Sequence, residues 1–203
     1  CRAHGVDAVG MGFDVGNLAQ VRAAVTRSRE AIGPIGGLAC CAAIIRLGPV
    51  GAIDFAQWDE VLRVNASGVA YAIEATLPEL RAVGRGASIV VVASTEGLRG
   101  SPLLAAYTAS KHAVVGLVRS ASLALAREGI RVNAVCAGAM STPMMDGAIA
   151  AAGEAVREQM IAAIPLGYIA EPHEVGRVIR FLLSSEASYV TGVALPADGG
   201  MLA

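Results

Sequence analysis

Two apolar runs, separated by a long helical segment, constrain the fold of this chain more than any other feature. The runs, Ser88 to Ala93 and Ile130 to Val135, have the length of strands. The apolar segment between them, residues 105–127, has the length of a helix. Short runs that are almost wholly apolar are typical of parallel strands buried on both faces. The sequence therefore predicts an α/β protein with a parallel sheet covered by helices.

The rest of the chain continues this alternation as one domain over residues 1–203, with no internal repeat and no linker. Asp14 or Asn17 can cap the first helix, and Asp54 can cap the second. The remaining predicted helices are 18–32, 58–80 and 171–184, and the remaining predicted strands are 6–13, 37–42 and 190–195.

Composition excludes several functions. The net charge is −1 and there is no basic run, which argues against a nucleic-acid partner. Mean hydropathy is high, at +0.58, but the longest apolar run, residues 35–45, is interrupted by glycines and is too short to span a bilayer. No secretory signal is visible at the start of the sequence. We therefore expect no membrane association.

The cysteines and histidines favour neither disulfides nor a metal site. Cys40 and Cys41 are adjacent, and no Cys-x-x-Cys motif occurs among Cys1, Cys40, Cys41 and Cys136. None of the three histidines is spaced with a cysteine as a ligand pair. The sequence predicts reduced, buried thiols in a cytoplasmic protein without a bound metal.

Tyr107 and Lys111 are the first candidates for chemistry. Four residues apart on a helix, their side chains share one face. A nearby cation favours the phenolate and lowers a tyrosine pKa that is ordinarily about 10. Such a tyrosine can exchange a proton with an alcohol or a carbonyl. For an isolated Tyr-x-x-x-Lys pair, a packed ring beside a solvated charge is the commoner explanation.

Further motifs accompany this pair along nearly the whole chain, and together they resemble the short-chain dehydrogenase/reductase family. The resemblance implies a Rossmann-like doubly wound parallel sheet. It also implies hydride transfer between NAD or NADP and a secondary alcohol or ketone. The matching pieces are Asp14-Val15, Val64-Asn65-x-x-Gly68, Ser94-x-x-Gly97, Tyr107-x-x-x-Lys111, Arg131 to Val135 and Asp198-Gly199-Gly200.

The resemblance assigns roles to four catalytic candidates. Tyr107 is the general acid and base, and Lys111 lowers its pKa and binds the nicotinamide ribose. Ser94 donates a hydrogen bond to the substrate oxygen. Asn65 holds a water in a proton relay to Lys111, with a purely structural role as an equal alternative. The residues implied to bind the cofactor are Asp14, Val15, Cys41, Ala42, Ala43, Tyr107, Lys111, Ala137, Gly138, Met140 and Thr142.

Two departures from the family pattern affect the cofactor site. Cys40-Cys41-Ala42-Ala43 stands where the family has Asn-Asn-Ala-Gly, and the family's phosphate loop, Thr-Gly-x-x-x-Gly-x-Gly, does not occur. Gly10, Gly12 and Gly16 do not supply it, because the third glycine comes one residue too late. We expect the fold to lack the family's first two strands, so that strand 37–42 is an exposed edge and residues 1–203 alone bind a dinucleotide poorly.

Several further expectations follow from the resemblance. Residues 141–165, rich in Met and Ala, are the expected substrate lid, and the substrate is a small, apolar molecule. The helices at 58–80 and 105–127 are expected to form the interface of a homodimer or homotetramer. The expected activity is that of a 3-oxoacyl reductase-like enzyme or a related alcohol dehydrogenase. The alternatives are a catalytically crippled family member serving as a structural partner in a hetero-oligomer, and a nucleotide-binding sensor without turnover.

Overall fold

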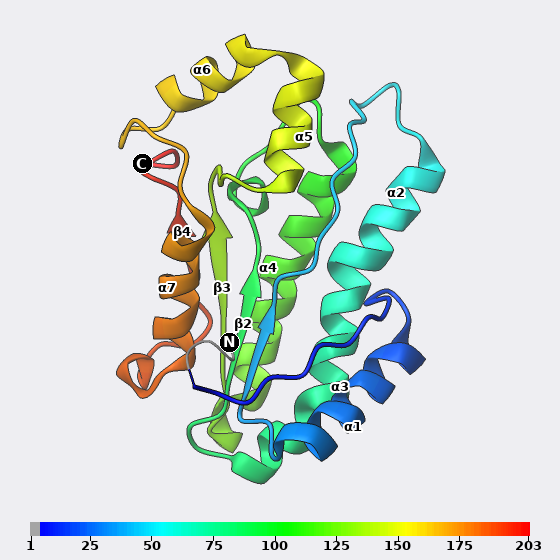
Figure 1. The fold of residues 1–203 in the computed structure, drawn as a ribbon, viewed down its shortest axis with the longest axis vertical. Helices are drawn as coiled ribbons and strands as arrows, with labels where there is room; N and C mark the ends of the chain where they lie inside the picture. Colours follow the sequence, from blue (N-terminus) through cyan, green and yellow to red (C-terminus); the bar gives the residue numbers. More distant parts are fainter. Residues whose placement is uncertain (1–4) are drawn as a thin grey trace.

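A four-stranded parallel sheet forms the centre of the computed structural model, which describes residues 5–203 (Figure 1). The strand order is β1-β2-β3-β4, so each strand lies beside the next strand in the sequence. In register, Leu38 lies opposite Ile89, and Ile89 lies opposite Val132. This Rossmann-like arrangement confirms the predicted fold class. The strands are β1 (Gly37–Cys40), β2 (Ser88–Val92), β3 (Arg131–Ala137) and β4 (Ala194–Ala197).

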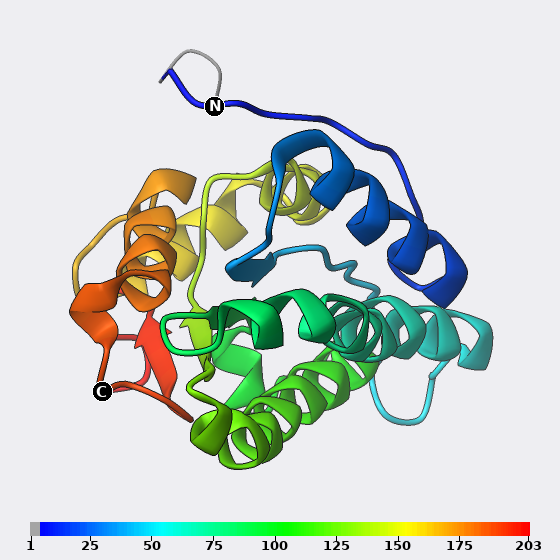
Figure 2. The same ribbon diagram turned by 90° about the horizontal axis from the view of Figure 1, so that it is seen from below.

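Helices cover both faces of the sheet, as apolar parallel strands require. α3 and α4 pack on one face, and α7 packs on the other (Figure 2). No helix in the described part of the chain is long and apolar enough to cross a membrane. The helices are α1 (Leu18–Ile32), α2 (Phe55–Leu62), α3 (Gly68–Val83), α4 (Ala105–Leu125), α5 (Pro143–Ala152), α6 (Glu154–Ala162) and α7 (Pro172–Leu183).

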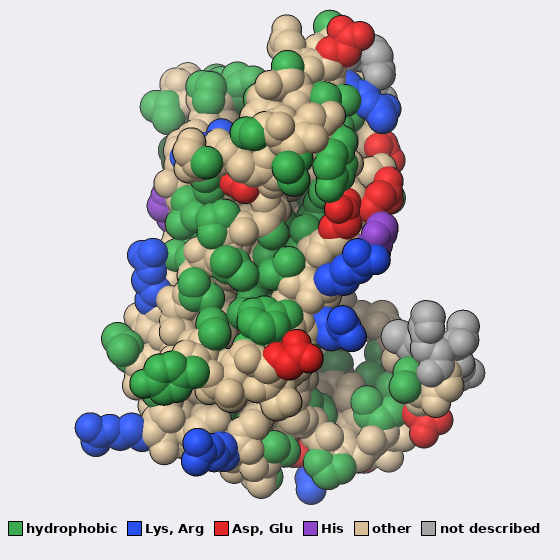
Figure 3. Space-filling model, turned by 90° about the vertical axis from the view of Figure 1, so that its left-hand side faces the viewer, with side chains coloured by type: hydrophobic (Ala, Val, Ile, Leu, Met, Phe, Trp, Pro, Cys, Tyr) green, Lys and Arg blue, Asp and Glu red, His purple; other side chains and the backbone are tan. Residues whose placement is uncertain are grey.

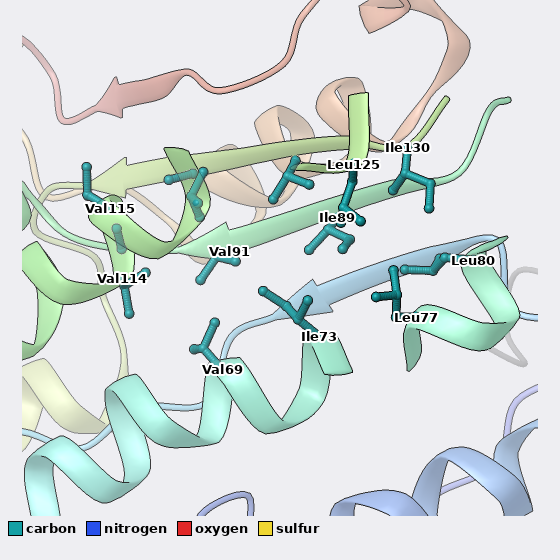
Figure 4. Packing of buried hydrophobic residues seen from close by; sticks show 14 of the residues in the cluster. Val69, Ile73, Leu77, Leu80, Ile89, Val91, Val114, Val115, Leu125 and Ile130 are labelled. Atoms are coloured by element: carbon teal, nitrogen blue, oxygen red, sulfur yellow. The ribbon is translucent and has the colours of Figure 1, made fainter. Parts of the chain in front are cut away.

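The core lies in two layers separated by the sheet. On one side, Ile73 and Leu77 of α3 face Ile89 and Val91 of β2 (Figure 4). On the other side, alternate residues of the same strands, such as Val90, pack against α7. Because successive strand residues point to opposite faces, both layers draw on the same two apolar runs.

The predicted helix ends agree closely with the structure. Asn17, the second of the two candidates, caps α1 by accepting hydrogen bonds from the backbone of Ala19 and Gln20. Asp54 caps α2 as predicted. The helix predicted over 58–80 is, however, interrupted: a π-helical turn, Arg63–Ser67, separates α2 from α3. Turns of this kind inside helices are frequent at functional sites.

The strand predicted over residues 6–13 is wrong, because this segment forms no regular secondary structure. Val6, Val9 and Phe13 are all exposed. A strand needs a neighbour for its backbone N–H and C=O groups. This segment passes outside α1, away from the described strands (Figure 2), so its apolar alternation has no sheet to join.

The last strand also differs from its prediction, which placed it over residues 190–195. β4 begins only at Ala194. Gly192 has a φ of +78°, in the left-handed region, and this breaks the extended backbone before the strand. The Gly192 amide nevertheless donates to the carbonyl of Val132, so the segment enters the sheet at a bend.

β1 is an edge strand, as expected, because it pairs with β2 alone among the described strands. A cavity of about 480 Å³ lies beside it, beneath α1 and α3. Its walls are mainly apolar, and they include Leu38, Val69 and Thr76. The Thr76 hydroxyl is buried and has no hydrogen-bond partner. The sheet edge at β1 therefore has no paired strand among the described residues, and it borders a cavity.

Candidate active site

A cleft of about 400 Å³ opens where β2 and β3 end and α4 and α5 begin. Carboxyl ends of parallel strands are the usual place for a ligand site in such sheets. The cleft brings together most of the sequence-predicted residues, whereas Asp14, Val15, Ala42 and Asn65 do not line it. Those that line it are Ser94, Tyr107, Lys111, Cys41, Ala43, Ala137, Gly138, Met140 and Thr142.

Ser94 follows β2 and caps a short 3-10 turn, Thr95–Gly97. Its hydroxyl accepts from the Glu96 amide at 3.3 Å and donates to the Glu96 carboxylate at 2.8 Å. A Cβ atom on Gly97 would lie 2.9 Å from the carbonyl oxygen of Lys111, closer than real contacts allow. Glycine therefore lets the turn pack directly on α4, which holds Ser94 beside Tyr107 and Lys111.

Lys111 and Tyr107 meet as their spacing on α4 predicts. The Lys111 Nζ lies 5.5 Å from the centroid of the Tyr107 ring, and it donates to the backbone carbonyl of Val92 at 2.9 Å. Lys111 is buried, and burial lowers its pKa to about 8. The lysine is thus not a solvated surface charge, which was the commoner explanation of this spacing.

The pKa of Tyr107 departs from the expectation that Lys111 lowers it. Burial raises the pKa of Tyr107, and the charge of Glu96 raises it further, while a hydrogen bond with the Ser94 side chain opposes them. Desolvation of the phenolate is the largest cause of this shift, and the Lys111 charge is not among its causes. Consequently Tyr107 is a protonated phenol at neutral pH, the form that can donate a proton to a carbonyl oxygen.

Asn65 lies in the π-helical turn and is 1% exposed. Its side-chain amide accepts from the backbone of Ile44 at 2.8 Å and donates to the Ile44 carbonyl at 2.9 Å. It also donates to the Ser110 hydroxyl at 3.1 Å. These three bonds fasten the segment after β1 to α4, and they agree with the structural alternative for Asn65.

The residues after β1 lie between two cavities. Cys41 lines both the cleft and the 480 Å³ cavity, whereas Ala43 lines only the cleft and Ala42 only the cavity. The prediction of buried cysteines is wrong for Cys41, which is exposed because it lies at this junction. Cys40 is half-buried, and burial raises its pKa to about 12. All three cysteines of the described residues are free thiols.

Asp14 lies outside both cavities. One carboxylate oxygen pairs with Arg63 at 2.7 Å, and the other accepts from the Gly16 amide at 2.8 Å. Both bonds lower the pKa of Asp14, so it stays ionised. Val15 next to it lines the 480 Å³ cavity. The described contacts of Asp14 are therefore structural.

α5 and α6, within the segment predicted to be a lid, contribute residues to one wall of the cleft. Thr142 caps α5 by accepting from the Met145 amide at 3.3 Å. The lid contributes methionine side chains to the wall, which is therefore largely apolar. The methionines on the cleft are Met140, Met144, Met145, Met160 and Met201.

Sequence reasoning missed one charged pair in this wall. Glu96 and Arg99 both line the cleft, and their side chains are 3.3 Å apart. The available signal was the position of Glu96 inside the Ser94-x-x-Gly97 motif. Any residue there is held close to Ser94. Within the described residues, no group of three His, Cys, Asp or Glu side chains could hold a metal ion.

This fold and this cleft define the class of protein. The chain matches the enoyl-(acyl carrier protein) reductase family over residues 1–202. It belongs to the short-chain dehydrogenase/reductase family, whose members are oxidoreductases.

Individual relatives are similar over almost the whole chain. The chain is 36% identical to 2-(S)-hydroxypropyl-CoM dehydrogenase 3 of Xanthobacter autotrophicus, over 98% of this chain and 78% of that protein. It is equally similar to a protein of the same bacterium described as inactive 2-(S)-hydroxypropyl-CoM dehydrogenase 2, over 98% and 87%. The crystal structure of a levodione reductase superposes with a TM-score of 0.93 at 34% identity, covering 98% of this chain and 78% of the other.

Proposed function

We propose that this protein is a nicotinamide-dependent oxidoreductase that interconverts a ketone and a secondary alcohol. One observation supports the proposal most strongly: Ser94, Tyr107 and Lys111 line one cleft, with the Lys111 ammonium 5.5 Å from the Tyr107 ring. A proton donor, a hydrogen-bonding hydroxyl and a cation together are what reduction of a carbonyl needs from a protein.

The donor set of the cleft fits the nicotinamide end of NAD or NADP. The Lys111 ammonium and the Tyr107 hydroxyl suit a ribose diol, and Thr142 with the backbone near Met140 suits a carboxamide. Cys41 lines both the cleft and the 480 Å³ cavity, so the two lie side by side, and in this proposal an elongated dinucleotide extends past Cys41. When bound, the cofactor supplies or accepts the hydride.

Tyr107 handles the proton in this proposal. Its raised pKa keeps the phenol protonated, so it can donate to the oxygen of a ketone as the alcohol forms. In the opposite direction the phenolate accepts the alcohol proton, a form favoured by high pH. Ser94, which its turn holds beside Tyr107, orients the same oxygen once its hydroxyl turns from the Glu96 carboxylate to the substrate.

The substrate class follows from the walls of the cleft. Methionine and alanine are the commonest residues in these walls, and residues 141–165 supply Met144, Met145 and Met160. We therefore propose an apolar ketone or alcohol, in a 3-oxoacyl reductase-like or related alcohol dehydrogenase reaction. The names of two relatives, a 2-(S)-hydroxypropyl-CoM dehydrogenase and a levodione reductase, support a ketone or secondary alcohol as the reacting group.

The assembly that we propose is a homodimer or homotetramer in the cytoplasm. Leu123 on α4 is 83% exposed, although the rest of that helix contributes heavily to the core. Hydrophobic side chains also gather on the side that carries α7 and β4 (Figure 3). Three free thiols are typical of a reducing compartment.

A panel of ketones and secondary alcohols, assayed with NADH and NADPH or their oxidised forms, tests the proposed function. We expect turnover of apolar substrates with at least one cofactor. A protein that binds a cofactor but turns over nothing in the panel would contradict the proposal. That result would favour the alternative of a nucleotide-binding family member without turnover. One relative, 36% identical to this chain, is itself described as inactive.

A further inference from the structure

Glu96 places a carboxylate inside a cleft whose other walls are mainly apolar. It lines the cleft together with Ser94, Tyr107 and Lys111, and its side chain is 15% exposed. An acidic side chain in such surroundings is unusual unless it is paired. Its contacts show how it is held there.

Three side chains stabilise the Glu96 carboxylate. The hydroxyls of Ser94 and Thr95 both donate to Oε2 at 2.8 Å, and Arg99 approaches Oε1 at 3.3 Å. Burial raises the pKa of Glu96, but these bonds and the Arg99 charge outweigh it, so the pKa is lowered overall. The carboxylate is therefore ionised at neutral pH.

The position of this charge is fixed by backbone packing. Glu96 belongs to the 3-10 turn whose Gly97 packs directly on the carbonyl of Lys111. The turn cannot withdraw from α4 without losing that contact. Arg99 offsets the charge only in part, because its own side chain is 40% exposed and faces solvent.

We propose that Glu96 is a specificity-determining residue, which makes the cleft select ketones and alcohols without a negative charge next to the reacting carbon. The inference rests on the proposed function, since Ser94 and Tyr107 mark where the reacting carbon lies. A substrate carboxylate bonded to that carbon would lie close to the Glu96 carboxylate. Like charges repel strongly where solvent screening is weak.

The test compares acetophenone with phenylglyoxylate, in which a carboxylate replaces the methyl group. The ratio of kcat/KM values for the two ketones is measured for the parent protein and for Glu96→Gln. Comparing ratios cancels the intrinsic reactivities of the ketones. We expect Glu96→Gln to shift the ratio toward phenylglyoxylate by about tenfold or more, about 1.4 kcal/mol.

Two further variants distinguish an effect of the Glu96 charge from an effect on the protein's folding. Arg99→Gln removes the compensating cation, so the ratio shifts the opposite way, toward acetophenone. Glu128→Gln removes a glutamate that pairs with Arg81 on the surface, and leaves the ratio unchanged. A folding defect would lower the kcat/KM values for both ketones together. It could not shift their ratio in opposite directions in the Glu96→Gln and Arg99→Gln variants.

The same comparison is made for binding, by calorimetry of each ketone with the protein saturated with cofactor. An unchanged ratio in Glu96→Gln, or equal shifts in Glu96→Gln and Arg99→Gln, would overturn the proposal. So would the failure of both ketones to bind. Absence of turnover with every ketone of the wider panel would instead contradict the proposed function.

Discussion

At the scale of single residues, burial dominates the chemistry of the cleft. Desolvation lowers the pKa of Lys111 to about 8 and raises that of Tyr107, so each group is pushed toward its neutral form. Sequence spacing correctly places the two side chains together. The spacing cannot reveal the surrounding dielectric, which determines the direction of the Tyr107 shift.

Replacing Tyr107 with Phe removes only the hydroxyl and leaves the ring packing intact. We expect kcat to fall at least about 10²-fold, because the proton donor is lost. Tyr189→Phe makes the same chemical change at a fully exposed tyrosine and should have no effect. Steady-state kinetics of the two variants check this, and a Tyr107→Phe enzyme with more than a tenth of the parental rate would disprove the role.

Lys111→Met should cost activity but raise stability at neutral pH. The folded-state pKa of about 8 lies below the ordinary lysine value of 10.5, so keeping Lys111 protonated costs at most about 3 kcal/mol. The variant also leaves the Val92 carbonyl without its donor, and this loss cancels about 1 kcal/mol of the gain in stability. We therefore expect a net gain of about 1–2 kcal/mol at pH 7.

The sign of this effect sets its pH dependence. The cost of a protonated Lys111 is fully present below pH 8 and disappears as the pH rises toward 10.5, where the unfolded chain also loses the proton. The stability difference between Lys111→Met and the parent should shrink across this range in denaturant titrations. A constant difference from pH 7 to pH 10.5 would show that Lys111 is not desolvated.

At the scale of elements, the contact between the Thr95–Gly97 turn and α4 holds the site together. Gly97→Ala would place a methyl group 2.9 Å from the Lys111 carbonyl. We expect about 1–3 kcal/mol of destabilisation and a fall in kcat/KM, since Ser94 moves away from Tyr107.

Gly116→Ala is the matched control for this prediction. Gly116 also lies on α4, but nothing is within 4 Å of its missing Cβ atom. The control should be stabilising by about 0.5–1 kcal/mol, because alanine is the better helix former. Thermal unfolding and steady-state kinetics compare the two. Similar effects in both variants would mean that the turn has room to move.

Elements with strong local signals were predictable, and elements defined by their neighbours were not. α1 has a capping residue, and α4 and β2 are apolar segments of clear length; the predicted ranges of all three agree closely with the structure. Residues 6–13 have a strand-like sequence but no partner strand, and β4 is shortened by the left-handed Gly192. The π-helical turn at Asn65 could not be predicted either, because its five residues are too few to alter the apolar pattern of the surrounding helices.

The candidate site likewise combines features with a local sequence signal and features that depend on contacts across the fold. Nine of the residues that line the cleft were predicted from motifs and the family resemblance, whereas the pairing of Asp14 with Arg63 joins residues 49 positions apart. Glu96 was missed because its role comes from where the turn places its carboxylate. Contacts across the fold, rather than spacing, determine these features.

At the scale of the whole molecule, exposed apolar side chains predict self-association. Leu123→Glu puts a charge on the exposed face of α4 and should convert an oligomer into monomers, because a buried unpaired charge costs several kcal/mol at an interface. Val50→Glu, at another exposed position, is the control. Light scattering gives the mass of each variant. An oligomer that survives Leu123→Glu would exclude this face as its interface.

In the proposed reaction, a hydride passes between a nicotinamide and a carbonyl carbon in the cleft. The most direct test uses NADH and NADPH with deuterium at both hydrogens of the dihydronicotinamide C4, together with an apolar ketone and this protein, and analyses the alcohol by mass spectrometry. We expect one deuterium on the carbinol carbon, formed by the parent protein and lost in Tyr107→Phe. An alcohol without deuterium, or labelled alcohol formed equally well by Tyr107→Phe, would contradict it.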